Sequence, residues 1–249
     1  MGIAPAGTTQ APLRHADAMV LAETEFARMV ALLHSLSTED WGKPTACELW
    51  DVRAMASHVL GMAEAQASVR QFAHDFRAAR KRASGKMIDA MTATQVDERA
   101  AMTPDAIVDD LAATAPKAVK ARRRTPALLR RVVRMKQDPP FEAEKWQFGY
   151  LVDTIFTRDT WMHRLDISRA TGREMELTGG HDGRLVAGVV GEWARRHGQP
   201  FTLSLTGSAG GKWQAGEGGE HLQLDALDFC WTLAGRAQGA GLLATEVPF

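Results

Sequence analysis

Three side chains whose types suit a metal ion stand out in the sequence. Asp159 and His163 lie four residues apart in the segment FGYLVDTIFTRDTWMHRLDISRA, and His58 precedes them on a separate segment. Read as a helix, the later segment has an apolar stripe formed by steps of three and four: Phe148, Val152, Ile155, Asp159, Met162, His163 and Asp166. A carboxylate and an imidazole buried on such a stripe are costly unless they pair or bind a cation.

Two interpretations of these residues follow. A carboxylate and an imidazole at positions i and i+4 can point at one ion, and His58 on a second helix would complete three protein ligands. Alternatively, Asp159 and His163 form a buried ion pair without metal, and His58 is a hydrogen-bonded core histidine. Asp166 could replace Asp159 as the partner of His163, or could orient its imidazole. The combination of all three potential ligands on two segments favours a metal site inside a helical bundle.

The other potential ligands and nucleophiles carry weaker signals. Cys47 has no histidine near it in sequence that would activate its thiol, and the second cysteine, Cys230, is far away. Two separate cysteines fit a reducing cytoplasm and exclude a disulfide framework. The remaining histidines are expected at solvated positions near turns, loop ends and the N-terminus: His15, His34, His74, His181, His197 and His221.

Bulk composition argues against nucleic acid and membrane partners. The 249 residues carry no formal net charge, and no apolar run reaches the roughly 18 residues that a spanning helix needs. The charge is uneven, since residues 70–136 hold 16 Lys and Arg against 7 Asp and Glu. The basic run at 117–136 could bind phosphate or a carboxylate, although a solvated helix face is favoured. The N-terminal stretch MGIAPAGTTQAPLRHAD has no signal pattern and is expected to be a short disordered lead, so the protein is expected in the cytoplasm.

Four long helices are expected to position the candidate ligands. They cover residues 16–36, a segment capped by Asp51, a segment that begins at Thr103 and Pro104, and the segment with Asp159 that ends at Gly172. Residues 122–140 are expected to be a loop with one short helix near 128–135. Four amphipathic helices of this kind predict a four-helix bundle, a fold that builds metal sites between facing helices.

The pattern changes near residue 178 and predicts a second domain. A helix over 182–197 is followed by the alternating segments FTLSLTG, KWQAG and HLQLD, and Asp225 is placed to cap a final helix. We expect an antiparallel meander between the two helices. The sequence therefore predicts a mainly α protein, with a bundle over 1–177 and a small α+β domain with a short antiparallel sheet over 178–249.

Three segments resemble one known family. LWDVRAMASHVLGM is similar to a segment of the DinB-like, mycothiol-dependent maleylpyruvate isomerase family, and RDTWMHRLDI is similar to its second metal segment. The stretch LSLTGSAGGKWQAG with LQLDALDFCWTLAGR resembles the small C-terminal domain of some members. The family has Glu where this chain has Asp159, and an arm shorter by one methylene could change coordination geometry or metal preference.

The resemblance implies a site and a chemistry. A divalent metal, expected to be Zn²⁺, would be held by His58, Asp159 and His163, with water or a thiolate in the open position. The thiol would be mycothiol, activated for attack on a small electrophile in a transferase or isomerase reaction. Arg236, in the terminal AGR, matches a family arginine thought to reach towards the site, where it could bind a carboxylate of substrate or thiol. An ordinary cation at a helix end is the alternative for Arg236.

Other functions stay open at this point. The same bundle could be a non-catalytic zinc-binding or small-ligand-binding module, which a fourth protein ligand would favour. A two-His-one-carboxylate iron oxygenase is a weaker possibility, because such sites usually occupy β-barrels. The expected partners are a small-molecule thiol and an electrophile, and the chain is expected to be a monomer or a homodimer. The sequence names neither the electrophile nor the thiol.

Overall fold

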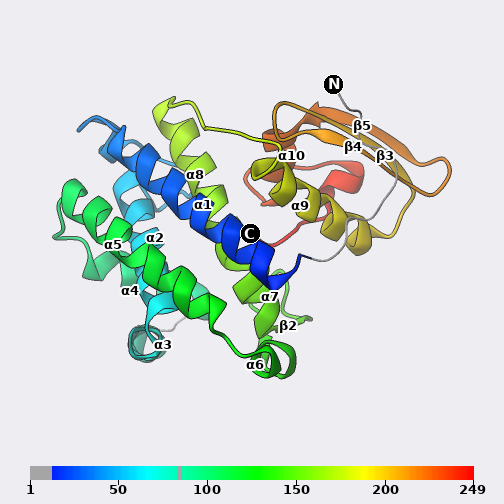
Figure 1. The fold of residues 1–249 in the computed structure, drawn as a ribbon. Helices are drawn as coiled ribbons and strands as arrows, with labels where there is room; N and C mark the ends of the chain where they lie inside the picture. The colour runs from blue at the N-terminus through cyan, green and yellow to red at the C-terminus, as the bar shows by residue number, and fades with distance from the viewer. Residues whose placement is uncertain (1–12, 83–85) are drawn as a thin grey trace. The chain divides into compact units, whose positions relative to one another are not determined.

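The computed structural model describes residues 13–82 and 86–249, which divide into a helical unit, residues 14–175, and a C-terminal unit from residue 176 to 249 (Figure 1). The helical unit contains α1 (His15–His34), η1 (Asp40–Gly42), α2 (Val52–Ala67), α3 (Val69–Arg82), α4 (Met87–Glu98), α5 (Pro104–Arg123), α6 (Ala127–Val132), β1 (Arg134–Lys136), β2 (Lys145–Gln147), α7 (Phe148–Tyr150), η2 (Leu151–Ile155) and α8 (Phe156–Thr171). No helix in the described part of the chain is both long and apolar enough to cross a bilayer.

The predicted four-helix bundle is confirmed. Its members are α1, α2, α5 and α8, and α1 packs on α5 and α8 while α2 packs on the same two helices (Figure 1). The helices begin where capping chemistry predicts. The Asp51 carboxylate accepts a hydrogen bond from the Ala54 amide at 2.8 Å, and the Thr103 hydroxyl accepts one from the Ala106 amide at 3.3 Å. Gly172 ends α8 in the left-handed region, with φ of 71°.

Two further helices, α3 and α4, were not predicted. They pack on each other and on α2. Their buried faces are short and polar: in α3 only Asp75 and Ala79 are buried, and in α4 the buried residues are Met91, Thr94 and Gln95. An apolar stripe is the main sequence signal of a helix, and α3 has one at Val69, Phe72 and Phe76 that our prediction did not use, although these side chains are exposed. Two of the buried polar side chains, Asp75 and Gln95, matter for the site.

The segment between α5 and α8 differs in part from the prediction. The short helix is present as α6, but the loop also contains the strand β1, which pairs antiparallel with β2. The helix that carries Asp159 is not regular throughout, because η2 is a π-helical turn. The carbonyl of Val152 in this turn accepts hydrogen bonds from the guanidinium of Arg122, which is buried. Burial lowers the pKa of Arg122 to about 10, and the expectation of a fully solvated basic run is therefore wrong at this residue.

The expected N-terminal lead is also shorter than predicted. Helix α1 starts at His15, whose imidazole lies 2.6 Å from an Asp153 carboxylate oxygen. The interaction ties the start of the helix to the π-helical turn. Residues 1–12 of the expected lead lie outside the described residues.

The C-terminal unit contains α9 (Asp182–His197), β3 (Phe201–Thr206), β4 (Gly211–Ala215), β5 (Glu220–Asp225), α10 (Ala226–Leu233) and η3 (Gly241–Ala244). Its elements occur where the sequence predicts them, and Asp225 caps α10 by accepting from the Leu227 amide at 2.8 Å. Apolar residues of β3 meet the helices: the ring centroids of Trp193 and Phe201 are 4.8 Å apart, and Trp193 and Phe229 are 5.3 Å apart. These contacts form the core of a small α+β unit.

The strand order corrects one expectation. The sheet runs β4-β3-β5, with β3 antiparallel to β4 but parallel to β5, so it is a hairpin with an added parallel strand and not a meander. The connection from β4 to β5 must therefore cross the start of β3. Gly219 permits the crossing, because its φ is 90° and a Cβ there would lie 2.0 Å from the carbonyl oxygen of Pro200. Glycine at this position thus lets the connection pass close to the backbone at the start of β3.

Candidate metal centre

The structure brings His58, Asp159 and His163 together within the helical unit. His58 extends from α2, and the other two extend from consecutive turns of α8. The Asp159 carboxylate reaches both rings, with its Oδ1 3.4 Å from His163 Nε2 and its Oδ2 3.7 Å from His58 Nε2. The two imidazole rings are perpendicular, with centroids 5.1 Å apart. One potential ligand atom from each residue lies within 4.8 Å of the others.

These separations suit one tetrahedral ion. Zinc binds histidine nitrogen and carboxylate oxygen at about 2.0–2.2 Å. At a tetrahedral angle such arms place two ligand atoms roughly 3.3–3.5 Å apart. The observed distances of 3.4 and 3.7 Å from the carboxylate to the two nitrogens are close to that value. The three side chains therefore fit a zinc-type cation with little movement.

Burial differs among the three side chains. His58 is 3% exposed and His163 is 6% exposed, whereas the Asp159 side chain is 22% exposed. Trp50, from the loop before α2, lies beside both rings, with centroids 5.0 Å from His58 and 6.0 Å from His163. The imidazoles are thus shielded from water, and the carboxylate marks the side from which solvent reaches the centre.

Each imidazole is held through its Nδ1 atom. His163 Nδ1 lies 3.0 Å from Oδ2 of Asp166, a buried carboxylate one turn further along α8. A carboxylate accepts, so Nδ1 donates, and Nε2, which faces Asp159, is the nitrogen left to bind a cation. The expectation that Asp166 contacts the His163 imidazole is met in this hydrogen bond. His58 Nδ1 lies 2.9 Å from Oε1 of Gln95 on α4.

Gln95 and its neighbour Asp75 are site residues that sequence reasoning missed. Gln95 Nε2 lies 3.2 Å from Oδ2 of Asp75 on α3, and both side chains are fully buried. Glutamine is not a usual metal ligand, and neither of the two helices was predicted. The one available signal was the apolar spacing of Val69, Phe72 and Phe76, which predicts the helix that carries Asp75.

The carboxylate and imidazoles shift one another's ionisation. Burial opposes the charged form of Asp159, but the charge of His163 one turn further along α8 prevails and holds the pKa of Asp159 well below the usual range. Burial also opposes the charged form of His163, yet Asp159 and then Asp166 raise its pKa to about 9. Without metal, Asp159 and His163 are therefore a buried ion pair. A cation must displace the proton on His163, because only the neutral imidazole has a free lone pair.

Cys47 lies nearer the centre than its sequence position indicated. Its sulfur is within 4.8 Å of a potential ligand atom of His163 and one of Asp166, and the residue is half-buried. The loop before α2 produces this proximity, since it also carries Trp50. No local pattern around Cys47 predicts that a histidine from α8 lies near its sulfur.

The remaining histidines only partly follow the expectation of solvent exposure. His181 is buried, which makes the expectation wrong for that residue. His197 is half-buried, with its ring centroid 4.3 Å from that of Trp193, and His15 is half-buried at the start of α1. The three exposed ones are His34, His74 and His221.

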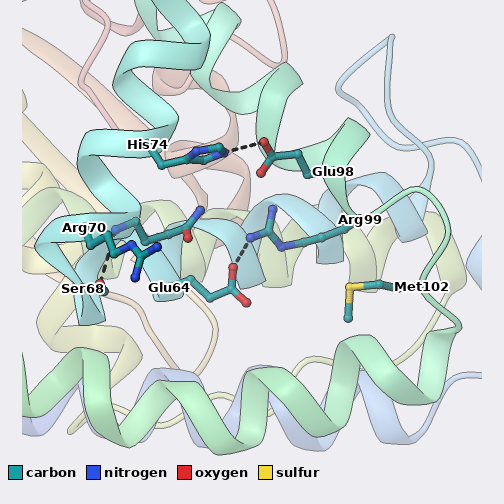
Figure 2. A pocket seen from close by; sticks show the side chains of 8 residues that line it. Glu64, Ser68, Arg70, His74, Glu98, Arg99 and Met102 are labelled. Atoms are coloured by element: carbon teal, nitrogen blue, oxygen red, sulfur yellow. Dashed lines mark hydrogen bonds and ion pairs between the residues drawn. The ribbon is translucent and has the colours of Figure 1, made fainter.

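A polar pocket with a volume of about 600 Å³ lies beside α2, α3 and α4 (Figure 2). In the wall of this pocket, His74 Nε2 lies 2.7 Å from Glu98 Oε1, and Arg99 forms an ion pair with Glu64 (Figure 2). His74, Asp75 and Glu98 are close enough to share an ion, but His74 and Glu98 are exposed and paired with each other. The buried set around Asp159 is the stronger metal candidate.

Arg236 belongs to the C-terminal unit and follows the end of α10. Its Nη1 donates to the carbonyl of Ala234 at 3.4 Å. Its role at the metal centre stays a prediction.

A bundle that directs two imidazoles and one carboxylate at a common point defines a class of helical proteins with a candidate metal centre. Within that class the assignment is specific: the model of the mycothiol maleylpyruvate isomerase N-terminal domain matches residues 22–168, so the chain belongs to this family. The match includes His58, Asp159 and His163. The predicted family is thereby confirmed.

Solved structures show the same fold over nearly the whole chain. The crystal structure of the mycothiol-dependent maleylpyruvate isomerase matches with a TM-score of 0.57 and 16% identity, over 94% of each chain. A histidine-to-alanine mutant of that enzyme matches with a TM-score of 0.56 and 16% identity, over 93% of each chain. No curated protein matches the chain in sequence. At this identity the likeness establishes the fold alone.

Proposed function

We propose that the protein is a metal- and thiol-dependent transferase or isomerase, in which His58, Asp159 and His163 hold a divalent cation of the zinc type. One observation carries the proposal: both imidazoles direct Nε2 at one carboxylate, at separations of 3.4 and 3.7 Å, while their Nδ1 atoms are occupied by other side chains. This arrangement prepares two nitrogen lone pairs and one carboxylate for a single ion.

Three protein ligands leave one position of a tetrahedral ion for a small molecule. A bound zinc ion lowers the pKa of a coordinated thiol, so that the thiolate exists at neutral pH. The chain contributes the surroundings: Trp50 shields the imidazoles from water, and Asp166 keeps the His163 lone pair directed at the centre. The partly exposed side of Asp159 is where the thiol would enter.

The proposed thiol is mycothiol, which the family description and the similar enzyme both name. The proposed second partner is a small electrophile, attacked by the thiolate in a transfer or isomerisation step. Arg236 is proposed to bind a carboxylate of the thiol or the electrophile, as a bidentate guanidinium can. The proposal includes a cytoplasmic location, a monomer or homodimer, and no nucleic-acid or membrane partner.

Metal content of the native protein tests the centre. Mass spectrometry would be run on the wild type, on His163→Ala, and on His34→Ala as a control whose imidazole is exposed at the end of α1. We expect about one zinc ion per chain in the wild type and the control, and none in His163→Ala. Absence of metal from all three proteins would reduce the centre to a buried ion pair.

Thiol transfer tests the reaction separately from the metal. Wild-type protein with zinc would be mixed with mycothiol and a set of small electrophiles, and the loss of free thiol would be followed. We expect zinc-dependent consumption that Arg236→Ala reduces, with Arg195→Ala, an exposed arginine of α9, as the matched control. Zinc binding without thiol binding would contradict the enzyme proposal while leaving the metal centre intact.

One observation favours a second candidate, a non-catalytic zinc-binding module. The Cys47 sulfur lies within 4.8 Å of a potential ligand atom of His163 and could provide a fourth protein ligand. A closed set of four ligands is typical of structural zinc. Cys47→Ser separates the two functions: it would weaken zinc binding strongly if Cys47 closes the site, and only slightly if a thiol occupies that position.

A further inference from the structure

His58 is held by a buried chain of side chains from three helices. Its Nδ1 lies 2.9 Å from Gln95 Oε1, and Gln95 Nε2 lies 3.2 Å from Asp75 Oδ2. The other oxygen of Asp75 accepts a hydrogen bond from Gln71 Nε2 at 2.7 Å. Gln71 lies in the wall of the polar pocket beside these helices. This series of hydrogen-bonded side chains therefore runs from that pocket to the proposed metal ligand His58.

The donors and acceptors of this hydrogen-bonded series determine which nitrogen of His58 donates to Gln95. Asp75 can only accept, and its oxygen next to Gln95 requires a donor there. The amide nitrogen of Gln95 must supply that donor, so its carbonyl oxygen faces His58. A carbonyl oxygen also only accepts, and Nδ1 of His58 must therefore be the protonated nitrogen. Nε2, 3.7 Å from Oδ2 of Asp159, is left as the nitrogen that can bind a cation shared with that carboxylate.

We propose that Asp75 and Gln95 are positioning residues that select the tautomer of His58 and thereby make Nε2 available to the cation. The inference rests on the metal centre proposed above. His163 is held by the Asp166 carboxylate directly, whereas His58 is held by the Asp75 carboxylate through an intervening amide. A buried carboxylate behind each imidazole also contributes negative charge near the bound cation.

Gly61 supports this reading independently. It lies one turn after His58 on α2, within the segment LWDVRAMASHVLGM. A Cβ at this position would lie 2.7 Å from both Cβ and Cγ of Gln95. A glycine here therefore allows α4 to bring the Gln95 amide against α2 and up to the imidazole. Without that close approach the 2.9 Å contact with His58 would be lost.

The inference predicts a paired effect of two substitutions. In Asp75→Asn, the new amide can keep accepting from Gln71 only by presenting its nitrogen to Gln95. Gln95 then rotates by half a turn, its nitrogen faces His58 Nδ1, and the proton moves to Nε2, which blocks metal binding. Adding Gln95→Glu restores two acceptor oxygens at position 95, so His58 Nδ1 donates again. The double variant also restores the net charge of the wild type.

Two measurements test the inference. Nitrogen-15 NMR of the proteins with added zinc reports which ring nitrogen of His58 carries hydrogen and which binds the ion. Zinc affinity is measured by competition with a chromogenic chelator. We expect Nδ1–H in the wild type and the double variant and Nε2–H in Asp75→Asn, with zinc affinity about 10–100-fold lower in Asp75→Asn and recovered in the double variant.

The outcomes separate this inference from the proposed function. A wild type that binds zinc, beside an Asp75→Asn variant with unchanged affinity and Nδ1–H, would overturn the inference and leave the metal centre standing. A wild type that binds no zinc would overturn the metal centre, and the inference with it. Thermal unfolding of each variant excludes a loss of fold as the cause. If Asp75→Asn does not fold, Gly61→Ala replaces it: reduced zinc affinity in a folded Gly61→Ala protein supports the inference, and unchanged affinity overturns it.

Discussion

Removal of the metal should make the stability of the helical unit depend on pH through His163. In metal-free protein the pKa of His163 is raised to about 9, against about 6.5 for an ordinary imidazole. A group with a raised pKa in the folded state stabilises the fold fully below its unfolded pKa. That contribution is lost as the pH rises from about 6.5 through about 9. The cause is the charge of Asp159, which stays ionised throughout this window because its own pKa is lowered.

The size of the effect follows from the shift. A difference of about 2.5 pKa units at about 1.4 kcal/mol per unit corresponds to roughly 3 kcal/mol. The value applies to a side chain that is only 8% exposed, so solvent screening is small. Against a typical total of about 5–15 kcal/mol, a loss of this size is easily measured.

The assay is urea unfolding of chelator-treated protein at about pH 6.5, 8 and 9.5, with His163→Gln as the matched variant. The wild type should lose about 3 kcal/mol more than the variant across this range, since the variant lacks the titrating imidazole. With saturating zinc the difference should disappear, because the bound imidazole is already deprotonated. Parallel pH profiles for metal-free wild type and His163→Gln would refute the ion-pair argument.

Other substitutions test separate parts of the structure. Asp159→Ala should abolish zinc binding. Asp159→Glu, which has the longer arm expected in the family, should bind zinc with an affinity within about tenfold of the wild type. A zinc content of Asp159→Ala equal to that of the wild type, measured by mass spectrometry, would exclude this carboxylate as a ligand. Asp51→Ala should lower the free energy of unfolding by about 1 kcal/mol in urea, because the cap on the Ala54 amide is lost; an unchanged midpoint would show that the cap contributes nothing. Gly219→Ala should destabilise the C-terminal unit by about 2 kcal/mol or more, because a Cβ meets the Pro200 carbonyl and φ is 90°; a thermal midpoint equal to that of the wild type would contradict the crossing described for β5.

Local sequence patterns were sufficient for most elements of the fold. The capping residues Asp51 and Asp225 and the terminal Gly172 act within one turn of the backbone, so their signals survive without tertiary information. The same is true of the pair Asp159 and His163, because residues four apart on a helix share a face whatever packs against it. Helix α4 escaped prediction because its buried face mixes polar and apolar side chains, Gln95 among them, whereas the apolar spacing of Val69, Phe72 and Phe76 in α3 was a usable signal that our prediction missed.

By itself, the sequence determined the bundle, the α+β unit and the types of side chain that can bind a cation, because each is encoded in short-range periodicity and residue chemistry. Tertiary structure decided which of them meet. Only packing of α2 against α8 brings His58 within 3.7 Å of Asp159, and only the approach of α4 at Gly61 brings Gln95 to the other side of that imidazole. The pairing of β5 parallel to β3 was likewise decided by a crossing at Gly219. Contacts between segments far apart in the chain depend on how whole faces pack, and no local pattern carries that information.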